Sequence, residues 1–328
     1  MILLTGATGY LGSQIAREIM ARKIPLRVLV RDPARLPFDA ASAGCEVVVG
    51  DLTDPAALRE AMRGVEHVIH TAALVKMWVR DRQDFWRVNV HGLMDLLREA
   101  SAAGVRRVVY TSSFIALGPS ADVDAGEGLR NRGPYANEYE ETKAQALTWL
   151  RREAGNFPVV TLLPGVIYGP GPKTEGNLVG GMIDQYLTGK FPGLLGDGNQ
   201  RWSFAYNADV VDAHLAALEK GRPGEEYVLA GDNCSLNDFF QLLAEVSAVR
   251  RPLRHLPFWA GKLAGAVEVA RANLFGHRPQ LTPGVVEIFK HDWVYSSTKA
   301  TTELSYRVTP LEEGLAKTLA ALGVRAIG

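Results

Sequence analysis

Short apolar runs alternate with helical patterns along the first half of the chain. The apolar runs predict buried strands at residues 1–4, 26–30, 46–49, 65–71, 107–112 and 159–163. Between them, apolar residues at helical spacing predict helices at residues 13–22, 55–62, 84–103 and 138–154. Such alternation is typical of a parallel sheet with helices on both faces. We therefore expect an α/β fold built on a doubly wound parallel sheet.

The pattern changes after Pro164, where turns rich in glycine and proline interrupt the alternation. This half predicts a strand at residues 226–229 and helices at residues 209–220 and 236–249. We expect a large domain over residues 1–164, to which segments near residues 204–232 return. Residues 165–203 and 233–328 would form a smaller C-terminal lobe that covers a substrate.

Residues 256–275 form an apolar segment that charged residues interrupt too often for a membrane span. Its apolar side chains recur on one helical face: Trp259, Leu263, Ala266, Val267, Ala270 and Leu274. The preferred interpretation is an amphipathic helix whose apolar face packs on the protein. A lid over an apolar substrate and a contact with a membrane surface are the alternatives.

Composition narrows the possible partners and the compartment. The chain has 36 basic and 36 acidic residues, so its net charge gives no reason to expect nucleic acid or an anionic membrane as partner. Cys45 and Cys234 lie far apart, which favours two small buried residues over a disulfide or a metal site. No basic leader precedes the first strand, and we expect a cytoplasmic protein without a metal.

A glycine-rich turn, Thr5-Gly6-Ala7-Thr8-Gly9-Tyr10-Leu11-Gly12, stands between the first strand and the first helix. A strand, a tight turn and a helix place backbone N–H groups and the positive end of a helix against a pyrophosphate. Gly6 permits the turn, Gly9 lets phosphates approach, and Gly12 lets the helix pack closely. The turn predicts a nucleotide site formed by Thr5, Gly6, Thr8, Gly9, Tyr10, Leu11 and Gly12.

Tyr139 and Lys143 are four residues apart on a predicted helix and therefore share one face. A phenol has a pKa near 10, and a nearby ammonium group lowers that pKa toward the range of a general acid or base. Upstream, the strand at 107–112 ends in hydroxyl side chains, Thr111-Ser112-Ser113. Ligands of such sheets bind at the carboxyl ends of the strands, where a serine could hydrogen-bond a substrate oxygen.

Five ordered motifs, TGATGYLG, VNVHG, YTSS, YEETK and PGVIYGPG, resemble those of the extended short-chain dehydrogenases/reductases, within the NAD-dependent epimerase/dehydratase superfamily. Other segments, among them TAALVKMW and GNQRWSFAYNADVV, resemble the dihydroflavonol 4-reductase-like branch, with its farnesol dehydrogenase-like and hopanoid-associated members. The resemblance implies a Rossmann domain and a nicotinamide cofactor. It also implies a homodimer that pairs through the helices at 84–103 and 138–154.

The resemblance further implies a catalytic triad of Ser113, Tyr139 and Lys143 that moves a proton while hydride moves to or from the cofactor. It selects Ser113 over Ser112, because Ser113 precedes the segment Phe114-Ile115-Ala116-Leu117-Gly118. Lys143 would also bind the nicotinamide ribose. Asn89 would distort its helix and support a water relay behind Lys143.

The choice of cofactor depends on the residue that follows the second strand, where Arg31 and Asp32 stand. An arginine here pairs with a 2′-phosphate, which favours NADP, whereas the adjacent acid works against it and leaves NAD open. By resemblance, the other cofactor contacts are Asp51, Leu52, Thr71, Ala72, Ala73, Tyr139, Lys143, Pro164, Gly165 and Val166.

The substrate side is expected to be apolar. Its candidate residues are Trp78, Ser113, Tyr168, Arg201 and Trp202. We expect an NAD(P)-dependent oxidoreductase that interconverts a secondary or allylic alcohol and its carbonyl on a hydrophobic substrate of dihydroflavonol, prenol or steroid type. One alternative is a nucleotide-sugar epimerase or dehydratase with tightly bound NAD, in which Arg201 clamps a phosphate. Another is a redox sensor that binds the cofactor without turnover.

Overall fold

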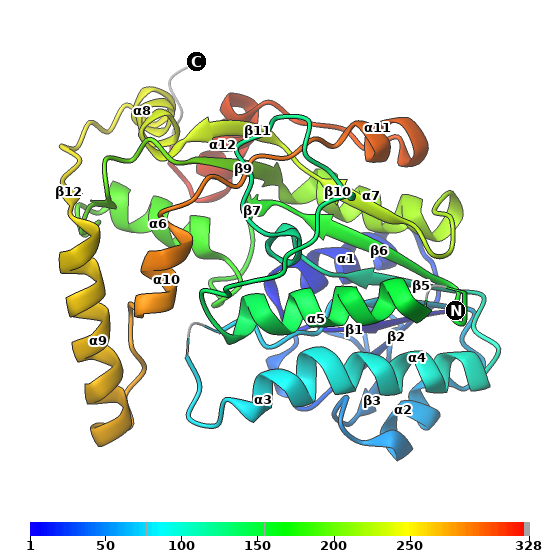
Figure 1. Cartoon of the computed structure of the whole chain (residues 1–328). Helices are drawn as coiled ribbons and strands as arrows, with labels where there is room; N and C mark the ends of the chain where they lie inside the picture. The colour runs from blue at the N-terminus through cyan, green and yellow to red at the C-terminus, as the bar shows by residue number, and fades with distance from the viewer. Residues whose placement is uncertain (77, 154, 325–328) are drawn as a thin grey trace.

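The computed structural model describes residues 1–76, 78–153 and 155–324, and it contains one large parallel sheet (Figure 1). The sheet has seven strands in the order β10-β6-β5-β4-β1-β2-β3, and every neighbouring pair is parallel. Its strands are β1 (Ile2–Thr5), β2 (Leu26–Val30), β3 (Glu46–Val49), β4 (His67–His70), β5 (Arg107–Thr111), β6 (Val159–Pro164) and β10 (Glu226–Leu229). Strands β2 and β3 are added on one side of β1, and β4, β5 and β6 on the other, so the strand order switches between β1 and β4. Such sheets bind ligands at this switch point.

Helices cover both faces of this sheet. Apolar side chains of α1 (Tyr10–Ala21) and α7 (Asn207–Glu219) pack into one core on one face. Those of α2 (Pro55–Met62), α4 (Gly92–Ala102) and α5 (Glu138–Glu153) form a core on the other face. The predicted doubly wound Rossmann fold is therefore confirmed.

The long helix predicted at 84–103 differs in detail from the structure. A short helix, α3 (Gln83–Trp86), passes through a π-helical turn over Arg87–His91 into α4. A π-turn inserts an extra residue into the helical ladder and frequently marks a functional site.

A second lobe surrounds a three-stranded sheet of β7 (Val166–Tyr168), β9 (Arg201–Tyr206) and β11 (Asp232–Ser235). Two further strands, β8 (Leu194–Leu195) and β12 (His255–Leu256), pair with each other. The remaining helices are α6 (Leu178–Leu187), α8 (Leu236–Ser247), α9 (Phe258–Phe275), α10 (Pro283–Ile288), α11 (Thr298–Leu304) and α12 (Leu311–Ala321). Within residues 201–235, α7 and β10 join the large sheet, whereas β9 and β11 belong to the small one.

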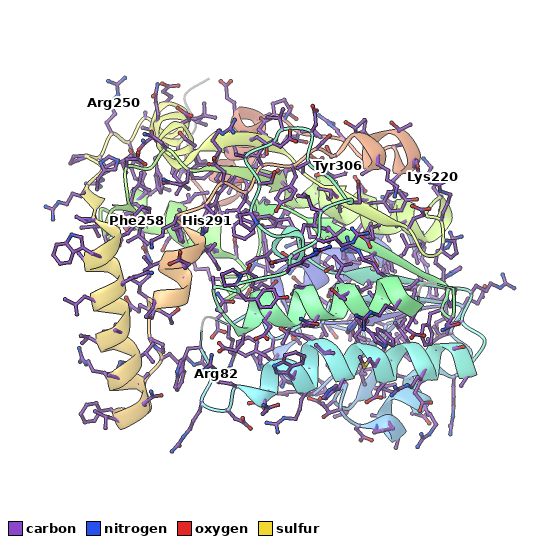
Figure 2. All side chains as sticks on the ribbon, viewed as in Figure 1. Arg82, Lys220, Arg250, Phe258, His291 and Tyr306 are labelled. Carbon is purple, nitrogen blue, oxygen red and sulfur yellow. The ribbon has the colours of Figure 1, made fainter. Side chains whose placement is uncertain are left out.

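The helix α9 packs on the protein with the face opposite to the one expected. Figure 1 shows it at the edge of the molecule beside α10, and Figure 2 marks Phe258 at its start. Its inner face carries glycines: a Cβ atom on Gly261 would lie 2.6 Å from Leu195 Cδ2, and one on Gly265 would lie 2.8 Å from the backbone of Thr282. The expected apolar face instead points to solvent, with Trp259 71% and Leu263 61% exposed.

The prediction that this apolar face packs on the protein is therefore wrong. The physical reason is close approach, because only small residues let α9 lie directly on α10 and on the loop before it. Among the described residues, no helix is long and apolar enough to cross a membrane.

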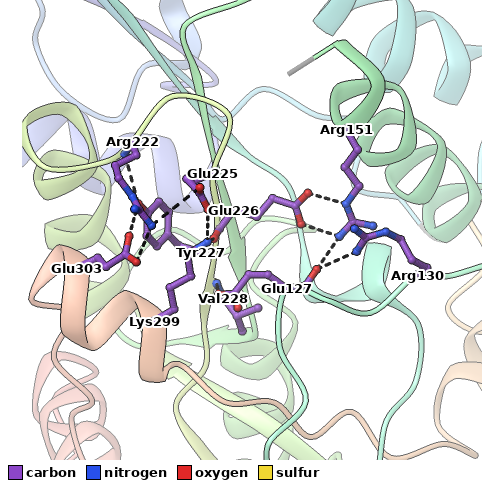
Figure 3. Close-up of polar contacts among 10 residues, drawn as sticks. All are labelled: Glu127, Arg130, Arg151, Arg222, Glu225, Glu226, Tyr227, Val228, Lys299 and Glu303. Atoms are coloured by element: carbon purple, nitrogen blue, oxygen red, sulfur yellow. Dashed lines mark hydrogen bonds and ion pairs between the residues drawn. The ribbon is translucent and has the colours of Figure 1, made fainter. Parts of the chain in front are cut away.

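Salt bridges and hydrogen bonds hold the edge strand β10 in the large sheet (Figure 3). Arg151 of α5 binds Glu226 through two nitrogen–oxygen contacts of 2.5 and 2.6 Å. The Glu127 carboxylate accepts the backbone N–H of Val228 at 2.7 Å, which satisfies a donor on the open edge. Lys299 of α11 binds Glu225 at 2.6 Å. These contacts fix the lobe segments around β10 to the Rossmann core.

Both cysteines, Cys45 and Cys234, are free thiols, and burial raises the pKa of each. Within the ranges that the structure describes, no cluster of three or more His, Cys, Asp or Glu side chains could hold a metal ion.

Candidate active site

The glycine turn between β1 and α1 has the tight geometry that the sequence indicates. Gly6 has a φ of +84°, and a Cβ atom there would lie 2.4 Å from Thr71 Oγ1. A Cβ atom on Gly12 would lie 2.2 Å from the Gly6 carbonyl oxygen, so the helix and the turn touch through backbone alone. At Gly9 the nearest atom would be the Gly6 oxygen at 3.2 Å.

This turn fits a dinucleotide pyrophosphate. Gly9 is the N-cap of α1, and no side chain caps the helix there. The first-turn N–H groups of Tyr10, Leu11 and Gly12 have no partner within the helix and are available to an anion. Thr8 stands partly exposed beside them. Tyr10 contributes its backbone only, because its buried phenol donates to the Gly169 carbonyl at 2.9 Å.

A buried hydrogen-bond network joins the ends of β1 and β4 beneath this turn. The Thr5 hydroxyl lies 2.7 Å from His70 Nδ1, and the Thr71 hydroxyl donates to the Thr5 carbonyl at 2.8 Å. Burial lowers the pKa of His70 to about 3, so its ring is neutral and shares one hydrogen bond with the Thr5 hydroxyl. Ala72 and Ala73 follow, partly exposed, at the carboxyl end of β4. These hydrogen bonds hold the carboxyl ends of β1 and β4 together beneath the glycine turn.

Arg31 and Asp51 lie together at the carboxyl ends of β2 and β3. The Arg31 Nε atom is 3.7 Å from Asp51 Oδ2, and the Arg31 side chain is largely exposed. Asp32 is occupied, because its carboxylate accepts the backbone N–H of Ala34 at 3.0 Å. Leu52 is buried against Gly92 at the start of α4. Asp32 therefore does not pair with Arg31, and the largely exposed guanidinium, which has Asp51 on one side, can still receive an anionic ligand.

Tyr139 projects from the first turn of α5, close to Ser113 at the end of β5. Burial raises the pKa of Tyr139 to about 12, and a hydrogen bond from Ser113 opposes this rise. The Ser113 hydroxyl also accepts the Ile115 N–H at 3.4 Å, at the start of a 3₁₀ turn over Phe114–Leu117. The structure thus brings Ser113 and Tyr139 together. Ser112 is also buried, but its Oγ has no hydrogen-bond partner among the described residues.

Lys143 lies one helical turn beyond Tyr139 and is only 2% exposed. Its ammonium group donates to the Thr111 carbonyl at 3.1 Å and to the Tyr110 hydroxyl at 3.3 Å. Burial lowers the pKa of Lys143 to about 7. The sequence predicted a lowered pKa for Tyr139. In the structure this pKa is raised, because desolvation outweighs any attraction from Lys143. A phenol that holds its proton at neutral pH is suited to act as an acid.

Asn89 lies in the π-turn and links α5 to the segment after β4. Its side chain accepts the Leu74 N–H at 2.7 Å and donates to the Thr142 hydroxyl at 3.1 Å. Thr142 precedes Lys143 in α5. Asn89, which is only 3% exposed, therefore positions the helix that carries Lys143.

Three buried residues around Lys143 have no counterpart in the sequence prediction: His70, Tyr110 and His214. The His70 and Tyr110 rings stack with centroids 5.6 Å apart. The His214 Nε2 atom lies 2.7 Å from the Thr111 hydroxyl, and burial lowers its pKa to about 4. Of these three residues, only Tyr110 lies in a motif that the sequence analysis singled out, YTSS. The two histidines lie on segments whose proximity only the fold reveals.

Pro164, Gly165 and Val166 connect the two sheets. β6 ends at Pro164, Gly165 donates its N–H to the Leu229 carbonyl at 3.0 Å, and Val166 begins β7 beside Phe204. A Cβ atom on Gly165 would lie 2.6 Å from the Ser203 oxygen. The chain therefore crosses from one lobe to the other at the carboxyl edge of the large sheet.

A hollow of about 310 Å³ lies at the N-terminal end of α5, next to the residue before Tyr139. Its wall mixes apolar side chains with polar and charged ones, and Arg82 and Glu138 form an ion pair there. The lining residues are Trp78, Val79, Arg80, Arg82, Phe85, Ala136, Asn137, Glu138, Val269, Asn273, Thr282, Pro283 and Gly284. The hollow therefore joins the Rossmann domain to α9 and α10.

Of the substrate candidates, only Trp78 lines this hollow. Tyr168 is fully buried and tilted against Tyr206, with ring centroids 5.6 Å apart. Trp202 is buried against Phe289 at 4.5 Å between ring centroids. The Arg201 guanidinium donates to the Ala121 carbonyl at 2.9 Å. The structure places these three in packing or backbone contacts, because β7 and β9 run through the core of the lobe.

Comparison with known proteins agrees with this architecture. The pattern of the NAD dependent epimerase/dehydratase family matches residues 2–230. The sterol demethylase protein B of Methylococcus capsulatus is 36% identical over 260 residues, which make up 78% of this chain and 77% of that protein.

Two further proteins match nearly the whole chain. A 4-hydroxy-2-methyl-3-oxo-4-farnesyl-3,4-dihydroquinoline-1-oxide ketoreductase of Stigmatella aurantiaca is 30% identical over 315 residues, 93% of this chain and 92% of that protein. The crystal structure of gox2253 shares 31% sequence identity, covers 98% of each chain and superposes with a TM-score of 0.80. This chain belongs to the NAD dependent epimerase/dehydratase family and is an enzyme of the extended short-chain dehydrogenase/reductase type.

Proposed function

We propose that the protein interconverts a secondary or allylic alcohol and its carbonyl on a hydrophobic substrate. The observation that carries the proposal is the group of apolar side chains in the hollow at the N-terminal end of α5, the turn of helix that also presents Tyr139. Trp78, Phe85, Val269 and Pro283 give this hollow a wall suited to a hydrocarbon skeleton. Two relatives whose names refer to a sterol and to a farnesyl ketone support the same substrate class.

The proton in this reaction is assigned to Tyr139. At neutral pH its phenol is protonated, since burial raises its pKa to about 12, and it can donate to a carbonyl oxygen as the alcohol forms. Ser113, hydrogen-bonded to the same phenol, would orient that oxygen. A nicotinamide held by the glycine turn and Lys143 would supply the hydride for the carbonyl carbon, or would accept it in the reverse direction.

Lys143 is assigned two tasks in this proposal. Its ammonium group, held between Tyr110 and Thr111, would bind the nicotinamide ribose. Its positive charge would also favour the phenolate of Tyr139 after proton donation. With a pKa of about 7, Lys143 gains or loses its charge near neutral pH, so its protonation would couple to the reaction.

A panel of cofactor-linked assays tests the proposal. The purified protein is offered apolar ketones and alcohols (prenols, steroids, flavonoids) and, separately, nucleotide sugars, each with NAD(H) and NADP(H). We expect net oxidation or reduction of the cofactor with the apolar panel only. An altered sugar with no net redox change would contradict the proposal and favour an epimerase, and cofactor binding with no turnover of either panel would favour a sensor.

NADP is the cofactor that we propose, because Arg31 presents an exposed guanidinium at the end of β2. A lost pair between an arginine and a phosphate costs about 1.5–3 kcal/mol, which corresponds to roughly 10- to 100-fold. We therefore expect Arg31→Ala to raise the KM for NADP(H) by that factor and to leave the KM for NAD(H) nearly unchanged.

Steady-state kinetics with both cofactors checks this prediction. Arg59→Ala is the matched control, because Arg59 is an exposed arginine of α2 that pairs with Glu99. An equal change in KM for both cofactors, or a higher catalytic efficiency of the wild type with NAD(H), would show that Arg31 does not select NADP.

A further inference from the structure

The outward side of α9 is an apolar surface that no other described part of the chain covers. It comprises the exposed residues Trp259, Leu263, Ala266, Val267, Ala270, Leu274 and Phe275. Leu274 and Phe275 are each 77% exposed, and Val267 is 50% exposed. A helix of a globular protein normally turns such a stripe inward, so its exposure indicates an interaction site.

The body of the protein fixes this orientation. Phe258 packs on Gly196, where a Cβ atom would lie 2.3 Å from the Phe258 ring. Lys262 Nζ binds the Glu287 carboxylate of α10 at 2.6 Å. Together with the inward glycines, these contacts prevent α9 from rolling its apolar face onto the protein. The apolar surface therefore stays exposed to solvent along a helix of 18 residues, which is about 27 Å long.

The charge around this helix differs from that of the whole chain. Between residues 250 and 278 there is one acidic residue, Glu268, and there are six basic ones. Lys262, Arg271 and Arg278 pair with carboxylates, whereas Arg250, Arg251 and Arg254, just before α9, have no acidic partner among the described residues. Figure 2 marks Arg250 above the N-terminal end of α9. Across the hollow from α9, Arg80 adds exposed positive charge, whereas the charge of Arg82 is paired with Glu138. An apolar face with aromatic ends and basic flanks matches the boundary between anionic headgroups and acyl chains.

A second copy of the chain is a poorer occupant. A twofold contact through α9 would set the same basic segment against itself, and like charges across an interface repel. An anionic bilayer would instead neutralise these charges while it receives Trp259 and Phe275, the type of side chain that lies at membrane interfaces.

We infer that α9 docks the protein on the surface of an anionic phospholipid bilayer, with its outward apolar face at the headgroup–acyl boundary. The same helix lines the hollow beside α5 through Val269 and Asn273. Docking would therefore bring the hollow close to the bilayer, and an apolar substrate dissolved in lipid would reach it by passing α9. This second step rests on the proposed function, whereas the docking itself does not.

Flotation with vesicles tests the docking without cofactor or substrate. Vesicles of equal parts phosphatidylglycerol and phosphatidylcholine are compared with pure phosphatidylcholine, for the wild type and for the double variant Leu263→Gln/Val267→Gln. We expect the wild type to float with the anionic vesicles and to be released by salt. The double variant should lose at least about tenfold in partitioning, because each glutamine removes apolar surface from the contact.

Val123→Gln is the matched control, because Val123 is a 53% exposed apolar residue away from α9. It should float like the wild type. The double variant should also keep its turnover of a water-soluble ketone, since neither residue lines the hollow. Failure of the proposed function would abolish that turnover in the wild type as well and would leave flotation unchanged.

Three results would overturn the inference. The wild type could fail to float with anionic vesicles, or the double variant could float as well as the wild type. Light scattering could also show a wild-type dimer that the double variant splits into monomers, in which case the face is an interface between copies.

Discussion

Tyr139→Phe is expected to lower kcat by about 10²- to 10⁴-fold, the usual contribution of a positioned general acid. The substitution removes one hydroxyl from the first turn of α5 and leaves the aromatic ring in place. The hydrogen bond with Ser113 disappears, while the glycine turn and the Arg31 pair at the other end of the site stay intact. Cofactor affinity and melting temperature should therefore change little, so that the loss lies in the chemical step.

Kinetics with an apolar ketone and fluorescence titration of the reduced cofactor separate these effects. Tyr135→Phe is the control, because Tyr135 is a partly buried tyrosine four residues earlier whose hydroxyl accepts from Gln145 at 3.3 Å. It should keep nearly full activity. Near-normal turnover by the Tyr139→Phe variant would remove Tyr139 from the mechanism and leave the proton transfer unassigned.

Lys143→Met should have the second large effect, on both activity and the pH dependence of stability. The variant loses the charge that would stabilise the Tyr139 phenolate and bind the ribose, and we expect turnover to fall by about 10²-fold or more. Burial lowers the pKa of Lys143 from 10.5 to about 7 in the folded protein. In the unfolded chain the same amine holds its proton up to a pKa of about 10.4.

The sign of the effect follows from proton counts. Between pH 7 and about pH 10 the unfolded state binds more protons at Lys143 than the folded state does, so the free energy of unfolding rises with pH in this window. Below pH 7 the cost of the buried charge is fully present. Relative to the methionine variant, the wild type should gain on the order of 3 kcal/mol between pH 7 and 10.

Urea unfolding of the wild type and the variant at several pH values measures this difference. Lys173→Met is the control, because Lys173 is an exposed lysine that pairs with Asp184 at 2.9 Å. Its stability curve should parallel that of the wild type. A constant difference between wild type and Lys143→Met across the window would show that Lys143 keeps an ordinary pKa.

The sequence predicted the Rossmann domain well because its signals there are local. The strands at 26–30 and 46–49 match the structure residue for residue, because both are short runs rich in β-branched residues between turns. β2 is largely buried, whereas β3, expected to be buried, is mostly exposed because it lies at the edge of the sheet. The glycine turn was equally clear, because Gly6 and Gly12 stand where a Cβ atom would strike backbone or Thr71. These features depend on residues close together in the chain.

The parts that the sequence missed depend on contacts between distant segments. The helical period of residues 259–274 indicates which residues share a face, but it does not tell whether that face meets protein or solvent. The inward glycines of α9, Gly261 and Gly265, gain their meaning only from Leu195 and Thr282 across the contact. Tyr168 and Trp202 were expected at the substrate for their chemistry, and their burial in the lobe core follows from the pairing of β7 with β9.

The pKa values of the site were also beyond the sequence. Spacing along α5 places Lys143 near Tyr139, and a surface pair of this kind would lower the tyrosine pKa. In the structure Lys143 is buried and Tyr139 is partly buried. Desolvation dominates and shifts the two pKa values in opposite senses, Tyr139 upward and Lys143 downward. Burial is a property of the assembled sheet and helices rather than of the motif.

Transfer of deuterium from a labelled cofactor tests directly whether the protein moves hydride between a nicotinamide and an apolar carbonyl compound. The protein is incubated with reduced cofactor that carries deuterium at both positions of nicotinamide C4 and with an apolar ketone, and the product is analysed by mass spectrometry. We expect one deuterium on the carbinol carbon and one oxidised cofactor for each alcohol formed. An unlabelled alcohol, or no conversion of any apolar ketone while a nucleotide sugar is epimerised without net oxidation of cofactor, would contradict it.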